Sequence, residues 1–163
     1  MRIFVDEDTG SSIAKALNAV GIPTEYPSAS KHSPVKTGDD DCKWLPFAGD
    51  KGMLVLSRNI AILQVEAERD LILAHKVGIV FLPAYLTRID LLRLVMKKWD
   101  WLLEIDASDD RPFAYYVTPT GRTVRLPLTS EVVRRLRRLA KRPTTPARLP
   151  ATYLAEESSL TPG

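Results

Sequence analysis

The stretch that decides the fold opens the chain: Ile3-Phe4-Val5-Asp6-Glu7-Asp8-Thr9-Gly10. A short apolar run that ends abruptly in three acids indicates a buried strand that delivers carboxylates at its carboxyl end. Open α/β sheets bind their ligands at that end of their strands. Neighbouring acids repel one another, so they either spread into water or are neutralised by a cation. The stretch therefore predicts an α/β fold and a candidate metal site.

Strand and helix signals alternate through the first two thirds of the chain. Buried strands are predicted over residues 1–5, 22–26, 53–56 and 78–82. Amphipathic helices are predicted over residues 11–20, 39–51, 65–76 and 88–105. We therefore expect a three-layer α/β/α sandwich around a mostly parallel sheet, with right-handed crossovers that place helices on both faces.

The last third of the chain differs in character. Two strand-like runs, 113–117 and 122–126, bracket Pro119-Thr120-Gly121 and predict a β-hairpin appended to the core. Residues 1–128 would then form the main domain, hairpin included. A basic helix is expected within residues 129–142, and the Pro-rich residues 143–163 are expected to be disordered.

Size and composition bound the class of protein. A chain of 163 residues is long enough to bury one core of its own. Its single cysteine, Cys42, cannot form an internal disulfide and gives no sign of an oxidising compartment. Apolar runs fall well short of the roughly 20 residues of a membrane span. We expect a soluble cytoplasmic protein with no membrane association.

The net charge of +3 is unevenly distributed. Residues 1–128 hold 16 Lys and Arg against 17 Asp and Glu, a balance of −1, and residues 129–163 hold 7 against 3, a balance of +4. The excess is concentrated in a run of arginines and lysines from Arg134 to Arg142. This basic segment either lies along a phosphate backbone or an acidic partner, or is a solvated helix face.

Polar side chains at the predicted strand ends suggest a common site. Asp6 and Asp8 follow the first strand, Asn59 follows the strand over 53–56, and Asp39-Asp40-Asp41 begins the helix between them. In a doubly wound sheet these positions share one edge, so Asp6, Asp8, one of the three later aspartates and Asn59 are expected to converge. An all-oxygen cluster suits Mg²⁺ or Mn²⁺ and not zinc, and such a cation favours phosphoryl chemistry.

Each of these features also has a simpler interpretation. The first acids can form an exposed turn, and acids at a helix start are explained by capping and by the helix dipole. Arg58 can contact a substrate phosphate or pair with the acids. Lys31, in the polar loop after the second strand, can touch substrate or simply be solvated.

The arrangement resembles the PIN-domain nucleases, in particular the compact VapC-type toxins. The resemblance rests on Ile3-Phe4-Val5-Asp6-Glu7-Asp8 with the helix from Ser12, on Asp41-Cys42-Lys43-Trp44-Leu45-Pro46, and on Leu54-Val55-Leu56-Ser57-Arg58-Asn59. The last run is similar to a strand that ends in Thr-Arg-Asp. Later segments around Val80, Trp99 and the hairpin extend the resemblance over residues 1–128.

The resemblance implies a PIN α/β/α sandwich and a Mg²⁺- or Mn²⁺-dependent ribonuclease, the toxin of a toxin–antitoxin pair. RNA would be the substrate, and an antitoxin protein and a second copy of the chain would be partners. Asp6, Asp41 and Asn59 stand at metal-site positions, Asp8 is a further ligand candidate, and Glu7 matches a position that is acidic in some relatives. Asn59 replaces an expected aspartate and removes one negative charge from the cluster.

Two other functions remain open at the level of sequence. One is a PIN-like module that binds a partner or RNA after Asn59 has weakened or abolished cleavage. The other is a haloacid-dehalogenase-like phosphatase, because Asp6 and Asp8 have the Asp-x-Asp spacing and Ser57 ends a strand. Gly10 departs from that family's pattern, and Pro112 with the hairpin fits poorly after its would-be acid pair, Asp109-Asp110.

Overall fold

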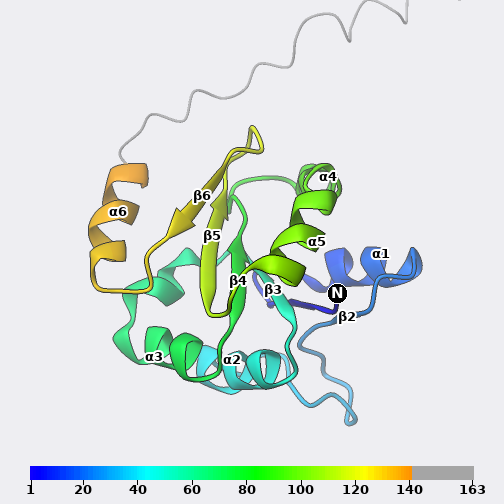
Figure 1. Ribbon diagram of the computed structural model, residues 1–163. Coiled ribbons are helices and arrows are strands. Elements are labelled where there is room, and N and C mark those ends of the chain that lie inside the picture. Colours follow the sequence, from blue (N-terminus) through cyan, green and yellow to red (C-terminus); the bar gives the residue numbers. More distant parts are fainter. Residues whose placement is uncertain (141–163) are drawn as a thin grey trace, which may run out of the picture.

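The computed structural model describes residues 1–140, with side chains up to residue 136 (Figure 1). One six-stranded sheet forms its centre, in the order β2-β1-β3-β4-β5-β6. Neighbouring strands are parallel except for the antiparallel pair β5 and β6. The strands are β1 (Ile3–Val5), β2 (Thr24–Glu25), β3 (Leu54–Ser57), β4 (Gly78–Phe81), β5 (Phe113–Val117) and β6 (Thr123–Leu126).

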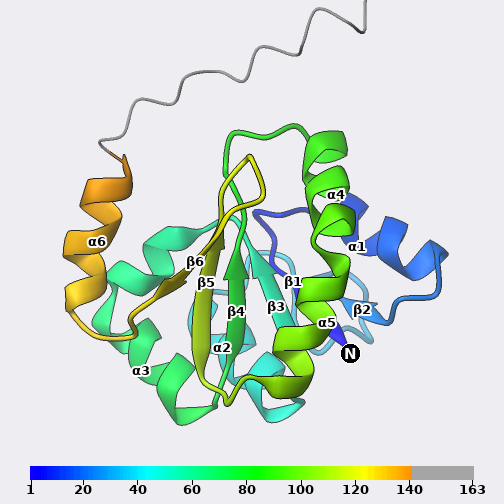
Figure 2. The same ribbon diagram turned by 45° about the horizontal axis from the view of Figure 1, so that its top comes forward.

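Helices cover both faces of this sheet, which confirms the α/β/α sandwich (Figures 1 and 2). Alternate strand residues point to opposite faces, so Phe4 and Val55 lie in one core, and Ile3 and Leu54 lie in the other. The first core is covered by α2 (Asp41–Asp50), the 3-10 helix η1 (Ile60–Gln64), α3 (Glu66–Ala74) and α6 (Glu131–Ala140). The second is covered by α1 (Ser11–Ala19), α4 (Arg88–Lys97) and α5 (Trp99–Ser108).

The strand order places a topological switch point between β1 and β3. From β1 the chain crosses outward to β2, then returns past β1 to β3 and continues to β4 and β5. Loops leaving the carboxyl ends of β1 and β3 therefore diverge to opposite faces of the sheet. In open α/β sheets a ligand crevice forms at such a point.

The crossovers do not all have the same hand. The connection from β1 to β2 runs in one direction across the sheet, and its helix α1 lies on one face. The connections from β2 to β3 and from β3 to β4 run in the opposite direction, and their helices α2 and α3 lie on the other face. These three connections share one hand. The connection from β4 to β5 runs in the same direction as the steps to β3 and β4, but its helices α4 and α5 lie on the same face as α1 (Figure 2). This last crossover is left-handed.

The expectation of right-handed crossovers is therefore wrong for the connection between β4 and β5. The face that a right-handed path would use is already occupied near these strands by α3, η1 and α6. On the other face, α4 buries Leu91, Leu94 and Val95 in the core that it shares with α1. Burial of these apolar side chains outweighs the usual preference for right-handed connections.

Two further predictions need correction. The single amphipathic helix expected over 88–105 is two helices, which meet at Lys98. Three of its large apolar side chains, Ile89, Met96 and Leu103, are exposed. The hairpin is confirmed but is not an appendage, because β5 pairs in parallel with β4 and belongs to the main sheet. Periodicity predicted the helical residues, but it could not predict where the chain bends to follow the core.

The end of the described region packs onto the rest of the molecule. Helix α6 buries Val132 and Leu136 in the core of α2 and α3, while Arg134 and Arg135 are exposed. The predicted disordered segment, 143–163, lies outside the described residues. None of the helices within residues 1–140 combines the length and the apolar character needed to cross a bilayer.

Candidate metal centre at the carboxyl edge of the sheet

Asp6 lies at the switch point, immediately after β1. It is only 3% exposed, and its backbone N–H still donates to the carbonyl of Leu56 on β3 at 3.3 Å. One carboxylate oxygen accepts from the Ser57 hydroxyl at 2.5 Å, and the other accepts from the backbone N–H of Thr9 at 2.9 Å. Its carboxylate therefore joins the ends of β1 and β3 in one fixed position.

The environment of Asp6 disfavours its negative charge. Burial raises the pKa of the Asp6 carboxyl above its ordinary value, and the nearby charge of Asp8 adds to this rise. Hydrogen bonds from Ser57 and Thr9 oppose the rise only in part. An ionised Asp6 is thus held in a site where a cation would stabilise it.

Asp41 and Asn59 form a second pair beside Asp6. Asp41 is the first residue of α2, and its carboxylate accepts from the indole N–H of Trp44 at 2.8 Å. The Asn59 amide nitrogen approaches the other Asp41 oxygen at 3.5 Å, a long contact. The backbone N–H of Asn59 donates to the Ser57 hydroxyl at 2.9 Å, so Ser57 links this pair to Asp6.

The negative charge of Asp8 acts on both Asp6 and Asp41. Burial is the main cause that raises the pKa of Asp41, and the charges of Asp8 and Asp40 add to it. Asp8 is itself exposed, on the turn between β1 and α1. The structure therefore brings the predicted residues Asp6, Asp8, Asp41 and Asn59 to one edge of the sheet.

The other predicted acids have structural partners. Asp39 forms an ion pair with Lys43 at 2.7 Å and accepts from the backbone N–H of Lys36 at 2.8 Å. A carboxylate oxygen of Glu7 accepts from the backbone N–H of Gly38 at 2.8 Å, which ties the loop before α2 to the turn after β1. Of the three aspartates 39–41, Asp41 is the one that contacts Asn59.

Sequence reasoning missed one acid of this region. Glu68 lies in the first turn of α3, and its pKa is raised by burial and then by the charges of Asp41 and Asp40. It approaches these residues because α3 packs on α2. A glutamate near the start of a helix carries no signal of this kind in the sequence, since the same position also suits the helix dipole. We refer to Asp6, Asp8, Asp41, Asn59 and Glu68 as the acid cluster.

The donor atoms of the acid cluster fit a hard divalent cation in kind. All are carboxylate or amide oxygens, and burial leaves the charges of Asp6 and Asp41 poorly compensated. Their present spacing is open: within residues 1–140, no three His, Cys, Asp or Glu side chains come close enough to hold a metal ion. A cation shared by these residues would therefore require their carboxylate and amide oxygens to move closer together.

Arg58 and Lys31 do not pair with these acids. Arg58 donates to the carbonyl of Leu86, in the loop between β4 and α4, at 3.2 Å. Among residues 1–140 it forms no ion pair, so of the two interpretations of Arg58 the pairing with the acids is wrong, and contact with a substrate phosphate stays a prediction. Lys31 is exposed on the loop that Glu7 ties down at Gly38.

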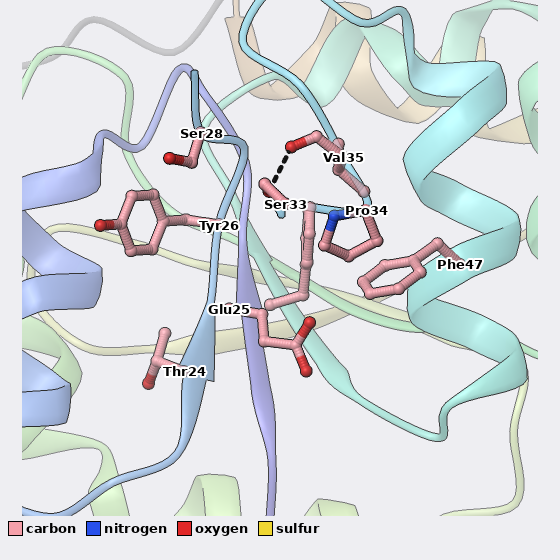
Figure 3. Close-up of a pocket in the computed structure, with 9 residues that line it drawn as sticks. Thr24, Glu25, Tyr26, Ser28, Ser33, Pro34, Val35 and Phe47 are labelled. Carbon is pink, nitrogen blue, oxygen red and sulfur yellow. Dashed lines mark hydrogen bonds between the residues drawn. The ribbon is translucent and has the colours of Figure 1, made fainter. Parts of the chain in front are cut away.

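A surface pocket lies next to this region but is separate from it. Its volume is about 250 Å³, and it lies between β2, the following loop and α2 (Figure 3). Tyr26, Pro34 and Phe47 contribute to its wall, and the Ser33 hydroxyl donates to the Val35 carbonyl beside it at 2.6 Å. Residues of the acid cluster do not line this pocket.

Comparison with known families agrees with this architecture. Residues 1–84, more than half of the chain, match the family model described as PIN like domain. The chain belongs to the PIN-like family. The matched segment runs from β1 through β4 and contains every residue of the acid cluster. No curated protein and no solved structure matches the chain. The resemblance to PIN domains is thereby confirmed, and with it a nuclease-type fold.

Proposed function

We propose that this PIN-like chain is a metal-dependent endoribonuclease, the toxin of a VapC-type toxin–antitoxin pair that acts on cytoplasmic RNA. The observation that supports it best is the position of Asp6. This buried carboxylate bridges β1 and β3 at the topological switch point, and the charge of Asp8 acts on both Asp6 and Asp41. Among the described residues no Lys or Arg pairs with Asp6, and a carboxylate oxygen is a ligand that suits Mg²⁺ or Mn²⁺.

In this proposal Asp6, Asp8 and Asp41 would hold the cation, and the Asn59 amide oxygen would be a neutral donor. A bound divalent ion polarises a phosphodiester and lowers the pKa of attacking water. The chain's own residues fix the geometry. Ser57 sets the Asp6 carboxylate through its hydroxyl, and Trp44 orients Asp41 through its indole N–H. Such supporting partners typically change metal affinity or activity by about 10–100-fold.

A second candidate function is a PIN-like binding module with weak or no cleavage. The observation in its favour is the orientation of Asn59, whose amide nitrogen faces Asp41 at 3.5 Å. The Asn59 amide N–H then lies beside the Asp41 carboxylate, where an aspartate at position 59 would instead help to bind a cation. Restoring the charge with Asn59→Asp distinguishes the two functions, because the variant gains Mn²⁺-dependent cleavage if the natural chain lacks it.

The phosphatase alternative loses its support. Asp109, which would supply its later acid, lies just before β5 and so at the amino end of the sheet, opposite Asp6. Its carboxylate accepts from the Tyr115 hydroxyl at 2.5 Å and lies 3.9 Å from the Arg125 guanidinium. These contacts explain Asp109 by structure alone.

RNA cleavage by the purified chain tests the proposal directly. A labelled single-stranded RNA is incubated with Mn²⁺, with Mg²⁺ or with EDTA. We expect cleavage only with a divalent ion, and a loss of at least about 100-fold in Asp6→Asn. Asp39→Asn is the matched control, because Asp39 pairs with Lys43 outside the cluster. Cleavage that persists in EDTA, or that Asp6→Asn retains, contradicts the proposal.

The partners belong to the same proposal and rest on the resemblance. An antitoxin and a second copy of the chain are expected to bind the toxin. Co-expression with any small protein encoded beside this chain tests the first, and sedimentation of the purified chain tests the second. We expect a stable complex that suppresses RNA cleavage, and a particle of twice the mass of the chain.

A further inference from the structure

Opposite the acid cluster, the same edge of the sheet carries two arginines that have no acidic partner. Arg58 follows Ser57 at the end of β3, and Arg88 is the first residue of α4. Neither forms an ion pair with any residue in the described part of the chain. Two arginines that form no ion pair, at the same edge of the sheet as an acidic site, are suited to bind an external anion.

The Arg58 guanidinium is positioned but incompletely bonded. Its Nη2 donates to the Leu86 carbonyl at 3.2 Å, and this bond directs the side chain toward the α1 and α4 side of the edge. Its Nε is buried and has no hydrogen-bond partner within residues 1–140. A buried N–H without an acceptor is destabilising, so the site is incomplete as it stands.

Arg88 lies against the first turn of α1. Its Nε and Nη2 are 3.8 and 3.9 Å from where a Cβ on Gly10 would stand, and the Ser12 hydroxyl is 3.9 Å from the same point. That hydroxyl is also buried without a partner among the described residues. The first turn of α1 has no acidic residue and no side-chain cap. A guanidinium beside the positive end of a helix is unfavourable unless an anion joins them.

These groups adjoin the acid cluster through short connections. Gly10 donates its backbone N–H to the carbonyl of Asp6 at 3.2 Å, and Ser57 precedes Arg58 and holds the Asp6 carboxylate. The arginines therefore lie on the α1 and α4 side of Asp6, while Asp41 and Glu68 lie on the α2 and α3 side. Arg88 and Gly10 are both solvent-accessible at this edge.

We propose that Arg58, Arg88 and Ser12 form a phosphate-binding subsite for single-stranded RNA, adjacent to the acid cluster. The subsite holds a backbone phosphate next to the one that is cleaved, and the strand crosses the edge from the α4 side to the α2 side. Guanidinium and hydroxyl groups are suitable donors to phosphate oxygens. Arg88 is exposed and can bind the phosphate directly, and the buried Arg58 Nε and Ser12 hydroxyl would join it once the side chains around them move. This inference rests on the proposed ribonuclease function and adds substrate-positioning residues to it.

Binding of RNA in EDTA tests the subsite separately from cleavage. The probe is a fluorescently labelled, mixed-sequence RNA of about twelve nucleotides, within the span that single-strand sites cover. Its affinity for the full chain is measured by anisotropy at several salt concentrations. We expect Arg88→Ala to weaken binding by about 3–10-fold and to reduce the slope of log K against log salt by about 0.7. Arg88→Lys keeps the charge and should keep the slope.

The matched control is Arg93→Ala, an exposed arginine of the same helix that pairs with Asp90 at 3.2 Å. It should leave affinity and slope unchanged. Arg58→Gln is expected to weaken binding as Arg88→Ala does, and a thermal melt reports whether this partly buried substitution folds. Because Arg88 is exposed, the test stands on Arg88 alone if the Arg58 variant is unstable.

The outcomes separate the two proposals. Equal RNA affinity in Arg88→Ala and Arg93→Ala overturns the subsite, whatever the cleavage assay gives. Weakened binding in Arg88→Ala together with no metal-dependent cleavage overturns the nuclease and keeps the subsite. Equal losses for duplex DNA and single-stranded RNA indicate general attraction to phosphate and overturn the assignment to single-stranded RNA.

Discussion

The two sides of the carboxyl edge of the sheet differ in charge and in the helices that carry their residues. On the α2 and α3 side, Asp6, Asp41 and Glu68 place negative charge where burial raises the pKa of each carboxyl. On the α1 and α4 side, Arg58 and Arg88 present cations without acidic partners among the described residues. Direct salt bridges would have satisfied both sides, yet the fold keeps them apart. Such separation suits a ligand that carries both a cation and phosphates.

The largest expected effect concerns the acid side. At a Mn²⁺ concentration about 100 times its dissociation constant, the natural chain should gain about 2.7 kcal/mol in its free energy of unfolding. Asp6→Asn should lose this gain, because the amide keeps an acceptor for Thr9 but lacks the charge. Thermal melts with and without Mn²⁺ measure the difference, with Asp39→Asn as the control. Equal Mn²⁺ shifts in the two variants would remove Asp6 from the metal site.

A smaller effect is expected for the hydroxyl that supports the acid side. Ser57 is fully buried and its oxygen contacts both Asp6 and the backbone N–H of Asn59. Ser57→Ala should cost about 1–3 kcal/mol in unfolding free energy, because it leaves buried groups unpaired. It should also lower cleavage by about 10–100-fold. Denaturant titration and the RNA assay measure the two effects, and Ser57→Thr, which restores the hydroxyl, should recover part of both.

The smallest effect is expected for the acid that lies farthest along the chain. Glu68→Gln removes a like charge near Asp41, so it should raise the free energy of unfolding without metal by about 0.2–0.5 kcal/mol. It should weaken Mn²⁺ binding only a few-fold, about as much as one distant charge contributes. Asp70→Asn on the same helix is exposed and lies beyond the first turn, so it should change neither quantity. If both variants behave alike, Glu68 is not part of the cluster.

The sequence was more informative for the acid side than for the arginine side. Asp6 and Asn59 follow buried strands and Asp41 begins a helix, so local patterns were enough to place them at one edge. Glu68 depends on how α3 packs against α2, which no local pattern encodes. Arg88 depends on two tertiary choices, the bend at Lys98 and the left-handed crossover. Along 88–105 the apolar period runs without interruption, so neither choice was visible.

The left-handed crossover also orders events in time. Domains fold as the chain leaves the ribosome, and the segment that matches the PIN-like family emerges first. That segment contains all of the acids and Arg58, but Arg88 follows only with α4, which must return across the sheet to α1. The residues of the acid cluster therefore leave the ribosome before Arg88 does. For a protein proposed to cleave RNA, an RNA-binding subsite that is completed last would delay RNA binding until synthesis of the domain is nearly finished.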